Sequence, residues 1–451
     1  MADTYLTRTP SSSSNRKTFT WSGWIKRSQL GATNTLFTSG YSSNAVASLR
    51  FNASDKLDVF DYNSSTQFAV VTNRLFRDTS AWYHIVMRVD TTQSTANDRV
   101  RLYVNGEQET SLTTNTQPSQ NYDTLYNGGV DYYIGRYGWT NADSFNGSMS
   151  HIHFCDGQSY APTEFGETDA TTGQWKIKTS PSVTYGTNGF FILKDGNSVT
   201  DQSGNSNNFT VGGGTLTKTE DNPSNVFATF SPLIKATTTF SNGNTTGQTQ
   251  NSSNYLAGMS TLGMPRGSGI YYCEIKLISE SATGESCIGV ACEEAFTLRD
   301  AGTLSIVGAD YNWGIRNANG LEYVDGGSSA SKHGNFTVGD IMGVYFDSTN
   351  DKLTYSKNGG WWNGTSSWTG TSPDLTNYFV GTSSGSYQTF FFNCGDAGNS
   401  VNAKWSANFG NGSFGTTAVS SAGTNTSGQI GIFEYNMPTN SKVLSTKGLN
   451  T

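Results

Sequence analysis

One phrase occurs twice in this chain, and it constrains the fold more than any other feature. The first copy runs from Trp82 to Glu107 and reads W-Y-H-I-V-M-R-V-D, a polar turn, then D-R-V-R-L-Y-V-N-G-E. The second runs from Gly339 to Gly360 and reads G-D-I-M-G-V-Y-F-D, a shorter turn, then D-K-L-T-Y-S-K-N-G-G. Each copy is an alternating apolar strand, an acidic polar turn, a second alternating strand and an N-G stop.

Both copies have the period of a half-buried antiparallel hairpin, because side chains alternate between the two faces of a strand. The residues that we expect to face inward are Ile85, Met87, Val89, Val100, Leu102 and Val104 in the first copy, and Met342, Val344, Phe346, Leu353 and Tyr355 in the second. Two such hairpins predict an all-β chain with two similar antiparallel β-sandwich (jelly-roll) domains in tandem. They favour a function based on binding surfaces over catalysis.

The composition agrees with a rigid all-β protein. The chain has 451 residues, enough for two or three domains. Charged residues make up 14% and aromatic residues 13%, with 51 glycines and 9 prolines. Aromatic residues at this density supply buried apolar area, which argues against disorder.

Several partner classes are excluded by the sequence. The net charge is −7 and the longest basic runs are the pairs Arg16-Lys17 and Lys26-Arg27, so no nucleic-acid partner is expected. The five cysteines form no C-x-x-C pair, which predicts buried free thiols made in a reducing cytoplasm. The N-terminus lacks an apolar signal core and no apolar run approaches the ~20 residues of a membrane span. We therefore expect a soluble protein, made in a cytoplasm, without membrane insertion.

Turn signals and low-complexity stretches divide the chain. Strand-like runs recur at roughly 8–12-residue intervals, the spacing of a sandwich. The expected parts are a polar N-terminal arm (1–17), a first sandwich whose C-terminal part wraps back over it (18–235), a linker (236–254), a second sandwich (255–410) and a C-terminal extension (411–451). The arm is expected to be a contact segment or a disordered tail, and the apolar end of the extension is expected to dock.

No set of residues predicts catalysis or a metal centre. His151 and His153 are expected to share one strand face with Cys155, either as two outward-facing histidines or as metal ligands without a fourth partner. Three acidic residues, Glu164, Glu167 and Asp169, lie in one loop, and Glu293-Glu294 form a pair. Neither group has the paired-carboxylate strand pattern that glycoside hydrolysis uses. We therefore predict no catalytic residue, no metal site and no cofactor.

Aromatic residues in polar loops are the candidate ligand-binding residues. Tyr137 and Trp139 lie in R-Y-G-W-T-N-A-D, Trp361 and Trp362 follow an N-G-G turn, and Trp368 lies in a Ser/Thr/Gly loop. Flat aromatic faces suit sugar rings, while nearby amide and carboxylate groups bind the hydroxyls. The alternative is that these rings cap the sandwich cores or pack against a sister subunit.

Several motifs resemble known domain families. The run F-N-G-S-M-S-H-I-H-F-C-D-G-Q at 145–158, together with the first hairpin, resembles the closing strands of LamG/concanavalin A-like domains. The second half, with Y-Y-C-E-I-K, C-I-G-V-A and the second hairpin, resembles a SPRY domain. The resemblance implies two concanavalin-like sandwiches, whose loops hold any recognition surface. His151 and His153 replace the acidic or basic residues that are usual in the first closing strand.

The segments between the domains resemble those of marine tailed-bacteriophage virion structural proteins. They are D-G-Q-S-Y-A-P-T-E-F-G-E-T-D at 156–169, T-G-Q-W-K at 172–176, Y-G-T-N-G-F at 185–190 and D-Q-S-G-N-S-N-N-F at 201–209. The opening R-T-P-S and N-R-K-T-F-T-W-S-G-W are also similar to that family. Proteins of this kind are tail fibres, decoration proteins or other structural proteins of the virion.

The resemblance implies a virion-surface protein made in the host bacterial cytoplasm. The function that we expect is a fibre or appendage subunit, a homo-oligomer with three-fold symmetry, which binds host-surface polysaccharide. Its N-terminal arm or C-terminal tail would contact other virion proteins. Two alternatives remain: a capsid-decoration or tail-attached structural protein, and a polysaccharide depolymerase.

Overall fold

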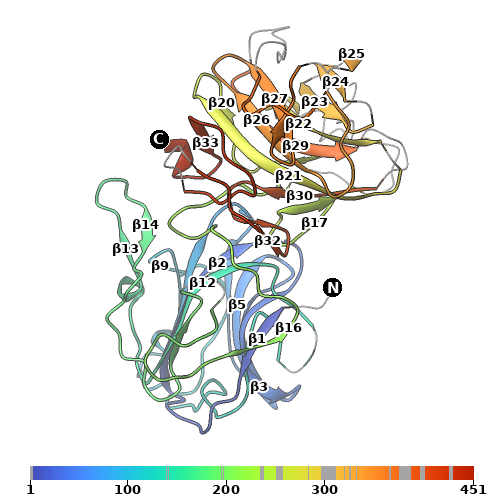
Figure 1. Ribbon diagram of the computed structural model, residues 1–451. Coiled ribbons are helices and arrows are strands. Elements are labelled where there is room, and N and C mark those ends of the chain that lie inside the picture. The colour runs from blue at the N-terminus through green and yellow to red at the C-terminus, as the bar shows by residue number, and fades with distance from the viewer. Residues whose placement is uncertain are drawn as a thin grey trace. The chain divides into compact units, whose positions relative to one another are not determined.

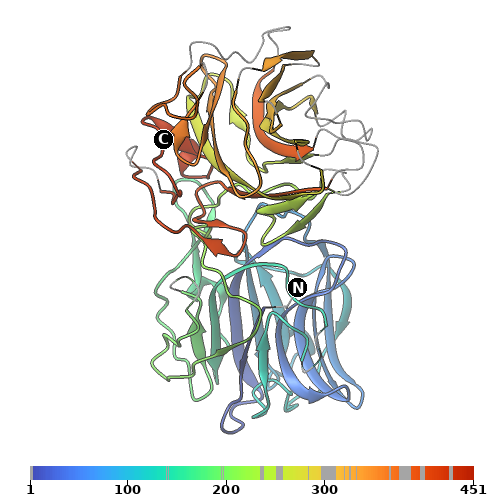
Figure 2. The same cartoon turned by 45° about the vertical axis from the view of Figure 1, so that its right-hand side comes forward.

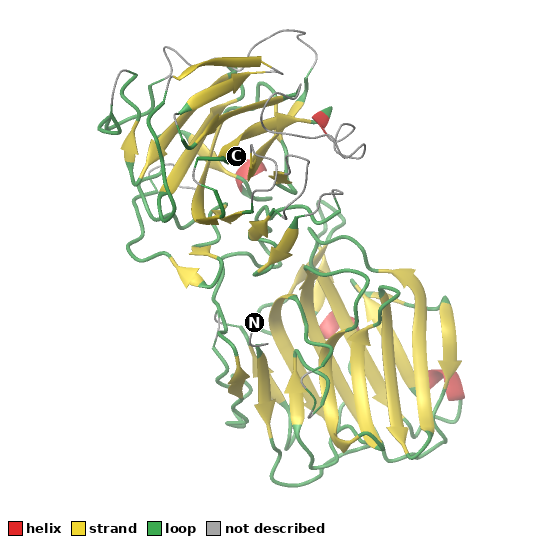
Figure 3. Ribbon diagram, turned by 90° about the vertical axis from the view of Figure 1, so that its right-hand side faces the viewer, coloured by secondary structure: helices red, strands yellow, loops and turns green. Residues whose placement is uncertain are grey.

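The structure is a computed structural model, and it divides the chain into two compact units. The first unit comprises Met1–Lys218 and Asn222–Ser224, and the second Thr219–Asp221 and Asn225–Thr451. The residues that the structure describes are 4–138, 140, 142–194, 196, 198–233, 238–249, 257–282, 284–295, 311–318, 320–324, 327–331, 333–364, 367–374, 387–396, 402–425 and 430–450. Strands dominate the regular structure of both units (Figure 3), so the all-β prediction is confirmed.

Two antiparallel sheets form the sandwich of the first unit (Figure 1). The front sheet has eight strands, in the spatial order β10 (Leu112–Thr116), β6 (Thr66–Leu75), β5 (Lys56–Asn63), β4 (Ala45–Phe51), β3 (Asn34–Ser42), β11 (Tyr132–Ile134), β1 (Tyr5–Arg8) and β16 (Thr210–Gly213). The back sheet has six, in the order β15 (Phe190–Ile192), β12 (Gly147–Asp156), β2 (Thr18–Arg27), β7 (Tyr83–Asp90), β8 (Val100–Val104) and β9 (Glu107–Gln108). Figure 2 shows the blue strands of the first unit running side by side. The core lies between the two sheets, where Trp21, Phe37 and Ile85 are fully buried.

The first sandwich begins earlier than the sequence indicates. Residues 5–8, which were expected to belong to a separate arm, form β1 inside the front sheet. Leu6 pairs with Ile134 and is 3% exposed. Further along, the backbone N–H of Asn15 donates to Asp156 at 3.1 Å. Backbone pairing with β11 and β16, one buried leucine and side chain–backbone bonds hold this segment, and none of these gives a periodic signal in so polar a sequence.

A segment that we name the strap, residues 157–187, covers the outer face of the back sheet. It contains the single-turn helix η2 (Pro162–Glu164) and the hairpin of β13 (Gly166–Thr168) and β14 (Trp175–Ile177), seen in Figure 1. Its apolar side chains, including Phe165, pack on Val86, Tyr103 and Cys155 of the back sheet. The strap lies within the C-terminal part of the segment 18–235, which was expected to wrap back over the first sandwich.

The second unit is also a sandwich of two antiparallel sheets. One sheet contains β17 (Thr239–Ser241), β18 (Thr246–Gln248), β30 (Ala403–Asn408), β21 (Ile270–Glu280), β26 (Ile341–Asp347), β27 (Lys352–Lys357) and β28 (Gly360–Trp361), with β33 (Ser441–Val443) parallel to β21. The other contains β19 (Ala257–Met259), β29 (Thr389–Asp396), β22 (Ser286–Cys292), β23 (Asn312–Arg316), β24 (Leu321–Val324) and β25 (Gly327–Ser331), with β20 (Met264–Pro265) beside β29. The smaller elements are η1 (Ala96–Asp98), η3 (Gly448–Asn450) and the pair β31 (Ser413–Phe414) and β32 (Thr417–Ala418).

The expected linker and extension both contribute to the second sandwich. Within 236–254, β17 and β18 form a hairpin, and β18 pairs with β30. In the C-terminal extension, β33 pairs with β21, and Val443 and Leu444 are fully buried. The low-complexity composition hides these strands, because Thr and Ser satisfy a strand position on a polar face as well as they satisfy a loop.

The repeated phrase forms two hairpins of the same design. In the first, β7 pairs with β8, with Met87 opposite Leu102. In the second, β26 pairs with β27, with Val344 opposite Tyr355. All the side chains predicted to face inward are buried: Ile85, Met87, Val89, Val100, Leu102, Val104, Met342, Val344, Phe346, Leu353 and Tyr355. The two predicted antiparallel hairpins are confirmed.

Both N-G stops close with the same geometry. Asn105 and Asn358 have φ values of 51° and 50°, in the left-handed region. Each asparagine side chain accepts the backbone N–H at the start of the first strand, from His84 at 2.8 Å and from Ile341 at 2.9 Å. Asparagine tolerates positive φ better than most residues, and its short amide reaches back to the strand. The turn therefore fixes the register of each hairpin.

Replacing Asn105 or Asn358 with alanine should destabilise the unit that contains it by about 2 kcal/mol, through left-handed strain and the lost hydrogen bond. Glycine at the same position should cost about 1 kcal/mol, because it adopts positive φ without strain. Urea unfolding of each variant measures both values. Asn115→Ala, at an exposed position of the edge strand β10, serves as the control and should change stability by less than about 0.5 kcal/mol. Equal effects of alanine and glycine would show that the backbone conformation is not what the asparagine provides.

In the described ranges, no helix has the length and hydropathy needed to span a membrane.

Candidate functional site

Trp361 and Trp362, predicted to be exposed sugar platforms, are each only 5% exposed. Trp361 lies in an apolar cluster, with its ring centroid 6.3 Å from that of Tyr272. The chain folds back after β28, because Trp361 and Gly370 exchange backbone hydrogen bonds of 2.9 and 2.8 Å. Phe433 and Met437 also pack in the Trp361 cluster, and Trp362 lies against His333, so the expectation that these two rings are exposed platforms is wrong.

Trp368 lies next to the buried pair and is partly exposed. Its ring is T-shaped against Trp362, with centroids 5.1 Å apart. The indole N–H donates to the carbonyl of Asn335 at 3.2 Å, and the Lys357 ammonium lies 5.7 Å from the ring centroid. One face of this ring is therefore used in packing, which corresponds to the core-capping alternative.

The other predicted aromatic residues follow β11 in the first unit. Trp139 lies outside the described residues. Tyr137 is partly buried and pairs with Ala142 in an isolated bridge. The loop that carries it turns back over the outer face of the front sheet, because the Thr38 hydroxyl donates to the Arg136 carbonyl at 3.2 Å.

The outer face of the front sheet has one continuous row of residues in register. Residues directly opposite each other on neighbouring strands share a face of the sheet. Such pairs link all eight strands in one row. From β10 to β16 the row is Thr116, Ala69, Phe60, Ser48, Thr38, Tyr133, Thr7 and Thr210. The Tyr137 loop crosses this row at Thr38, where a Cβ on Gly138 would lie 3.9 Å from the Thr38 side chain. The strands on the β10 side of the loop stay partly exposed.

That open part carries a group that we name the Phe60 patch: Arg50, Asp58, Phe60, Tyr62 and Tyr137. Phe60 and Tyr62 occupy alternate positions of β5 and are both partly exposed. The Arg50 guanidinium lies 4.7 Å from the centroid of the Phe60 ring. Its Nε donates to the Asp58 carboxylate at 3.0 Å, directly across β4 and β5. Two aromatic rings and an ion pair therefore share one exposed face.

The Arg50–Asp58 pair is only partly removed from water. The Arg50 side chain is 25% exposed and that of Asp58 10%. Burial raises the pKa of Asp58 above its ordinary value, although the neighbouring Arg50 lowers it. Burial likewise raises the pKa of Tyr137, and Arg50 again acts in the opposite direction. A ligand at the Phe60 patch would therefore meet an oriented cation and acceptor beside an apolar ring.

A second arginine–aromatic stack continues the same face toward β1. The guanidinium of Arg136 lies 3.9 Å from the ring centroid of Tyr5 and 5.1 Å from that of Tyr133. Arg136 is 6% exposed and its Nε donates to the Gly138 carbonyl. This stack holds Arg136 and Gly138, on either side of Tyr137, against the outer face of the front sheet.

Arg50, Asp58, Phe60 and Tyr62 were not predicted as site residues. Their only signal in the sequence is the alternation of D-V-F-D-Y, which places Asp58, Phe60 and Tyr62 on the face opposite Leu57 and Val59. Alternation does not say which face of a strand meets solvent or which strands lie next to it. That information comes from the sheet order.

The two histidines of β12 face away from the sandwich core, as predicted, but both are buried. His151 is 8% exposed and His153 1%. A bulge interrupts the register between Ser150 and His153, and His151 has a φ of 50°. The bulge lies between Met149 and Ile152, which both face the core, so His151 and His153 keep one face, as expected. Both rings lie against Phe191, at 5.6 and 4.0 Å, and the strap covers His153.

The predicted acidic groups also have structural partners. Asp169 accepts the backbone N–H groups of Thr171 and Thr172, both at 2.9 Å. Among the described residues, one metal-like cluster occurs, formed by Cys292, Glu293 and Glu294. Both carboxylate oxygens of Glu293 accept backbone N–H groups, from Gln388 at 2.6 Å and Thr389 at 2.7 Å, which explains its position without a metal.

All five cysteines are free and buried, which confirms the prediction made for them. They are Cys155, Cys273, Cys287, Cys292 and Cys394.

Comparison with solved structures gives low-identity similarities to β proteins. The SPRY domain of human HERC1 is 16% identical, with a TM-score of 0.31, over 40% of this chain and 96% of that chain. Mouse laminin α1 domains LG4-5 are 10% identical, with a TM-score of 0.28, over 92% of each chain. Domain 4 of an extracellular arabinanase from Geobacillus stearothermophilus, solved with arabinotriose, is 18% identical, with a TM-score of 0.25, over 33% and 65%.

No curated protein is similar enough to the chain to count as a match. Residues 2–161, which include β4, β5 and the whole Phe60 patch, match the family model of the Concanavalin A-like lectin/glucanases superfamily.

Proposed function

We propose that this chain is a surface protein of a tailed-phage virion, and that its first sandwich binds host-surface polysaccharide at the Phe60 patch. The observation that carries the binding part is the partly exposed Phe60 ring beside the Arg50–Asp58 pair. The superfamily match at residues 2–161 supports it, because the name of that family covers lectins and glucanases. The virion part rests on the resemblance of the segments between the domains to phage structural proteins.

The chemistry of the Phe60 patch suits a sugar ring. Pyranose C–H groups pack on aromatic faces, and hydroxyl groups need donors and acceptors placed at the edge of the ring. Phe60 and Tyr62 supply the faces, and Arg50 and Asp58 supply a donor and an acceptor held at a fixed separation by their own ion pair. A fixed pair loses little conformational entropy when the ligand binds.

Phe60→Ala should weaken binding to a host polysaccharide at least about tenfold, because it removes the apolar face of the patch. Isothermal titration with the tightest-binding host glycan on an array measures the dissociation constant. Val211→Ala is the control, since Val211 is 44% exposed on β16 at the far edge of the same sheet. Its affinity should match that of the unaltered protein. Unchanged affinity of the Phe60 variant would exclude the patch as the site.

We propose binding without cleavage. Glycoside hydrolysis uses two carboxyl groups across the scissile bond, and the Phe60 patch contains one, Asp58, which is ion-paired with Arg50. Incubation with host capsule should produce no new reducing ends. Release of reducing ends by the purified protein would instead establish a depolymerase.

The rival function is a capsid-decoration or tail-attached structural protein whose loops contact other virion proteins. It is favoured by the lack of any long helix or helical shaft in the described residues, because a receptor-binding fibre commonly needs a spacer. We propose assembly as a homo-oligomer, with a trimer expected. Cryo-EM of the intact virion distinguishes the two: density on the tail supports attachment, and density on the capsid faces supports decoration. The same map gives the stoichiometry.

A further inference from the structure

Histidines are concentrated under the strap. The chain has four histidines, and His84, His151 and His153 all lie on β7 and β12 of the back sheet, which the strap covers. His84 and His153 are 0% and 1% exposed. Each of these two rings makes direct contacts with strap residues. The contact surface between the strap and the back sheet is therefore rich in the one side chain that ordinarily titrates near neutral pH.

The hydrogen bonds of His84 require a neutral ring. The indole N–H of Trp175, in β14 of the strap, donates to His84 Nδ1 at 3.0 Å. An indole nitrogen is a donor only, so Nδ1 is the unprotonated nitrogen and the ring proton lies on Nε2. Nε2 is 2.9 Å from the hydroxyl of Ser22. A proton added at Nδ1 would point directly at the Trp175 N–H and break this contact.

The aromatic packing around His84 depends on the same indole. The His84 ring is stacked between Trp24 of β2, at 4.9 Å, and Trp175, at 5.9 Å. Trp175 also covers the N-G turn, because a Cβ on Gly106 would lie 2.6 Å from its ring. Loss of the Trp175–His84 hydrogen bond therefore weakens the contact of the β13–β14 hairpin with the β7–β8 hairpin of the back sheet.

His153 contacts the strap at Phe165, next to β13, and at Tyr185. Its Nδ1 is 2.9 Å from the Tyr185 hydroxyl, and its ring is 5.1 Å from that of Phe165. On its other side it stacks on Phe191 of β15, at 4.0 Å. A charged imidazole has no carboxylate hydrogen-bond partner here among the described residues. Protonation would therefore place an uncompensated charge between apolar rings.

We propose that the strap is a pH-sensitive cover, which detaches from the back sheet when His84 and His153 are protonated. Burial lowers the pKa of His84 to about 3, and burial, with smaller effects of His151 and His84, lowers that of His153 well below its usual range. The two histidines therefore bind protons more weakly when the strap is attached than when it is detached. Its stability is complete above the ordinary histidine pKa of 6.5 and is lost progressively as the pH falls below it.

The charges nearby do not reverse this direction. Burial is the cause of the lowered pKa of His84, and for His153 burial is joined by the neighbouring His151 and His84, which act in the same direction. Among the nearby cations, Arg88 of β7 donates to Ser159 of the strap at 2.7 Å, and Lys194 lies 5.8 Å from the Phe191 ring centroid. The cations on the elements packed around the two rings are Lys26, Arg88, Arg101, Lys176, Lys178 and Lys194, and the other titratable groups there are Tyr103, Glu107, His151, Cys155, Tyr160, Glu164, Glu167, Asp169, Tyr185 and Asp201. The carboxylates of Glu167 and Asp169 are ion-paired with Lys176.

Detachment would uncover an apolar surface and a thiol. Val86, Tyr103 and Cys155 lie on the outer face of the back sheet under Phe165, and Cys155 is 0% exposed. The ends of the strap stay anchored, because the Thr20 hydroxyl donates to Gln158 and the Asp156 N–H donates to Tyr185. The detaching part is therefore the middle of the strap, around β13 and β14.

The reaction of Cys155 with 4,4′-dithiodipyridine, followed by peptide mass spectrometry on the full chain, measures detachment. The rate is divided by that of the urea-unfolded chain at the same pH, which removes the intrinsic pH dependence of the thiol. We expect the normalised rate to rise at least about tenfold between about pH 7.5 and about pH 5.5. The amides of β3, β4 and β5 should stay protected from hydrogen exchange over the same range.

Three variants make the test specific. His84→Gln keeps an acceptor for Trp175 but does not titrate. The increase of the normalised Cys155 rate on acidification should therefore be smaller, because only His153 still contributes to it. Trp175→Phe removes the donor, and should raise the rate at about pH 7.5 while flattening its pH dependence. His333→Gln, in the second unit, is the control and should leave the profile unchanged. The proposal is overturned by a pH-independent rate, by an unchanged profile in His84→Gln, or by loss of amide protection in β3–β5 at the same pH.

Discussion

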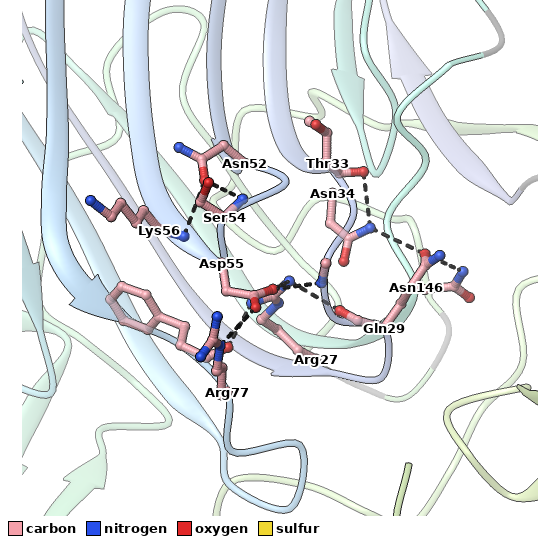
Figure 4. A network of polar contacts seen from close by, with 12 residues as sticks. Arg27, Gln29, Thr33, Asn34, Asn52, Ser54, Asp55, Lys56, Arg77 and Asn146 are labelled. Carbon is pink, nitrogen blue, oxygen red and sulfur yellow. Dashed lines mark hydrogen bonds and ion pairs between the residues drawn. The ribbon is translucent and has the colours of Figure 1, made fainter. Parts of the chain in front are cut away.

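Asp55→Ala should destabilise the first unit by about 3–5 kcal/mol, because it leaves the buried Arg27 without its counter-ion. The Arg27 side chain is 0% exposed, and its Nη2 lies 3.0 Å from Asp55 Oδ1 (Figure 4). The same oxygen accepts the Gly31 N–H at 2.8 Å, and Oδ2 accepts from Arg77 at 3.0 Å. Burial raises the pKa of Asp55, but these three donors outweigh burial and leave its pKa below the ordinary value. Chemical denaturation at neutral pH measures the loss.

The expected loss of stability in Asp55→Ala is large because the Arg27–Asp55 ion pair connects several elements. Arg27 ends β2, Asp55 lies in the turn between β4 and β5, and Arg27 Nη1 donates to the carbonyl of Phe76 at 2.6 Å. The Arg27 guanidinium also lies 4.5 Å from the ring centroid of Phe51. One ion pair therefore joins both sheets of the first sandwich at this end.

Three controls separate the contributions at Asp55. Arg77→Ala removes the 59%-exposed partner and should cost less than about 1 kcal/mol. Arg27→Met combined with Asp55→Ala removes both buried charges and should recover part of the loss. Because Asp55 has a φ of 61°, Asp55→Asn keeps a residue that tolerates this conformation and isolates the charge effect. Equal losses in Arg77→Ala and Asp55→Ala would contradict the assignment of the effect to the buried pair.

Glu274→Ala should destabilise the second unit by about 3 kcal/mol or more, because it leaves buried donors without an acceptor. Glu274 lies in β21 and is 0% exposed. Its carboxylate accepts the backbone N–H groups of Glu434 at 2.8 Å and Tyr435 at 2.9 Å, and so holds the C-terminal extension on the sheet. Hydrogen exchange of these two amides should accelerate together with the loss of global stability.

The same carboxyl group gives the second unit a defined pH dependence. Burial raises the pKa of Glu274 from 4.5 to about 7, against the opposing hydrogen bonds from Glu434, Tyr435, Tyr272 and Asn408. A raised folded-state pKa means that its contribution is complete below 4.5 and is lost as the pH rises through about 7. The loss is about 3 kcal/mol over this range.

Glu274→Gln does not titrate, and its unfolding free energy should therefore lack this component. Urea denaturation between about pH 4.5 and about pH 7.5 gives the slope for both proteins. Glu434→Gln is the matched control, because it removes a partly exposed carboxylate from the adjoining segment, and it should keep the slope of the unaltered protein. The same slope in Glu274→Gln and in the unaltered protein would show that another group is responsible.

The hairpins were predictable from the sequence because every signal in them is local. Alternation identifies the buried face of β7, β8, β26 and β27, and the N-G pair identifies the left-handed turn at Asn105 and Asn358. The sequence suggested that the C-terminal part of the first domain, up to 235, wraps back, but it indicated neither the strap at 157–187 nor the contact of the strap with His84. That contact joins Trp175 to a residue 91 positions away, and no spacing rule reaches so far.

The candidate site could not be predicted from the sequence, because the exposure of its residues depends on contacts between distant segments. Trp361 and Trp362 follow a polar turn, as an exposed platform would, but segments distant in the sequence bury them: the C-terminal extension packs on Trp361 and the His333 segment on Trp362. Phe60 looks like any apolar residue of an alternating strand, and its exposure depends on the order of β4, β5, β6 and β10 in the sheet. Solvent exposure of a strand face is a tertiary property, whereas alternation is a local one.

The position of a bound glycan on the protein tests the proposed function most directly. Hydroxyl-radical footprinting, with and without a saturating host polysaccharide, measures the oxidation of each aromatic side chain. Phe60 and Tyr62 should become at least several-fold less reactive when the glycan is bound, while Trp368 of the second unit should keep its reactivity. Protection of Trp368 with unchanged oxidation of Phe60 and Tyr62 would contradict glycan binding at the Phe60 patch.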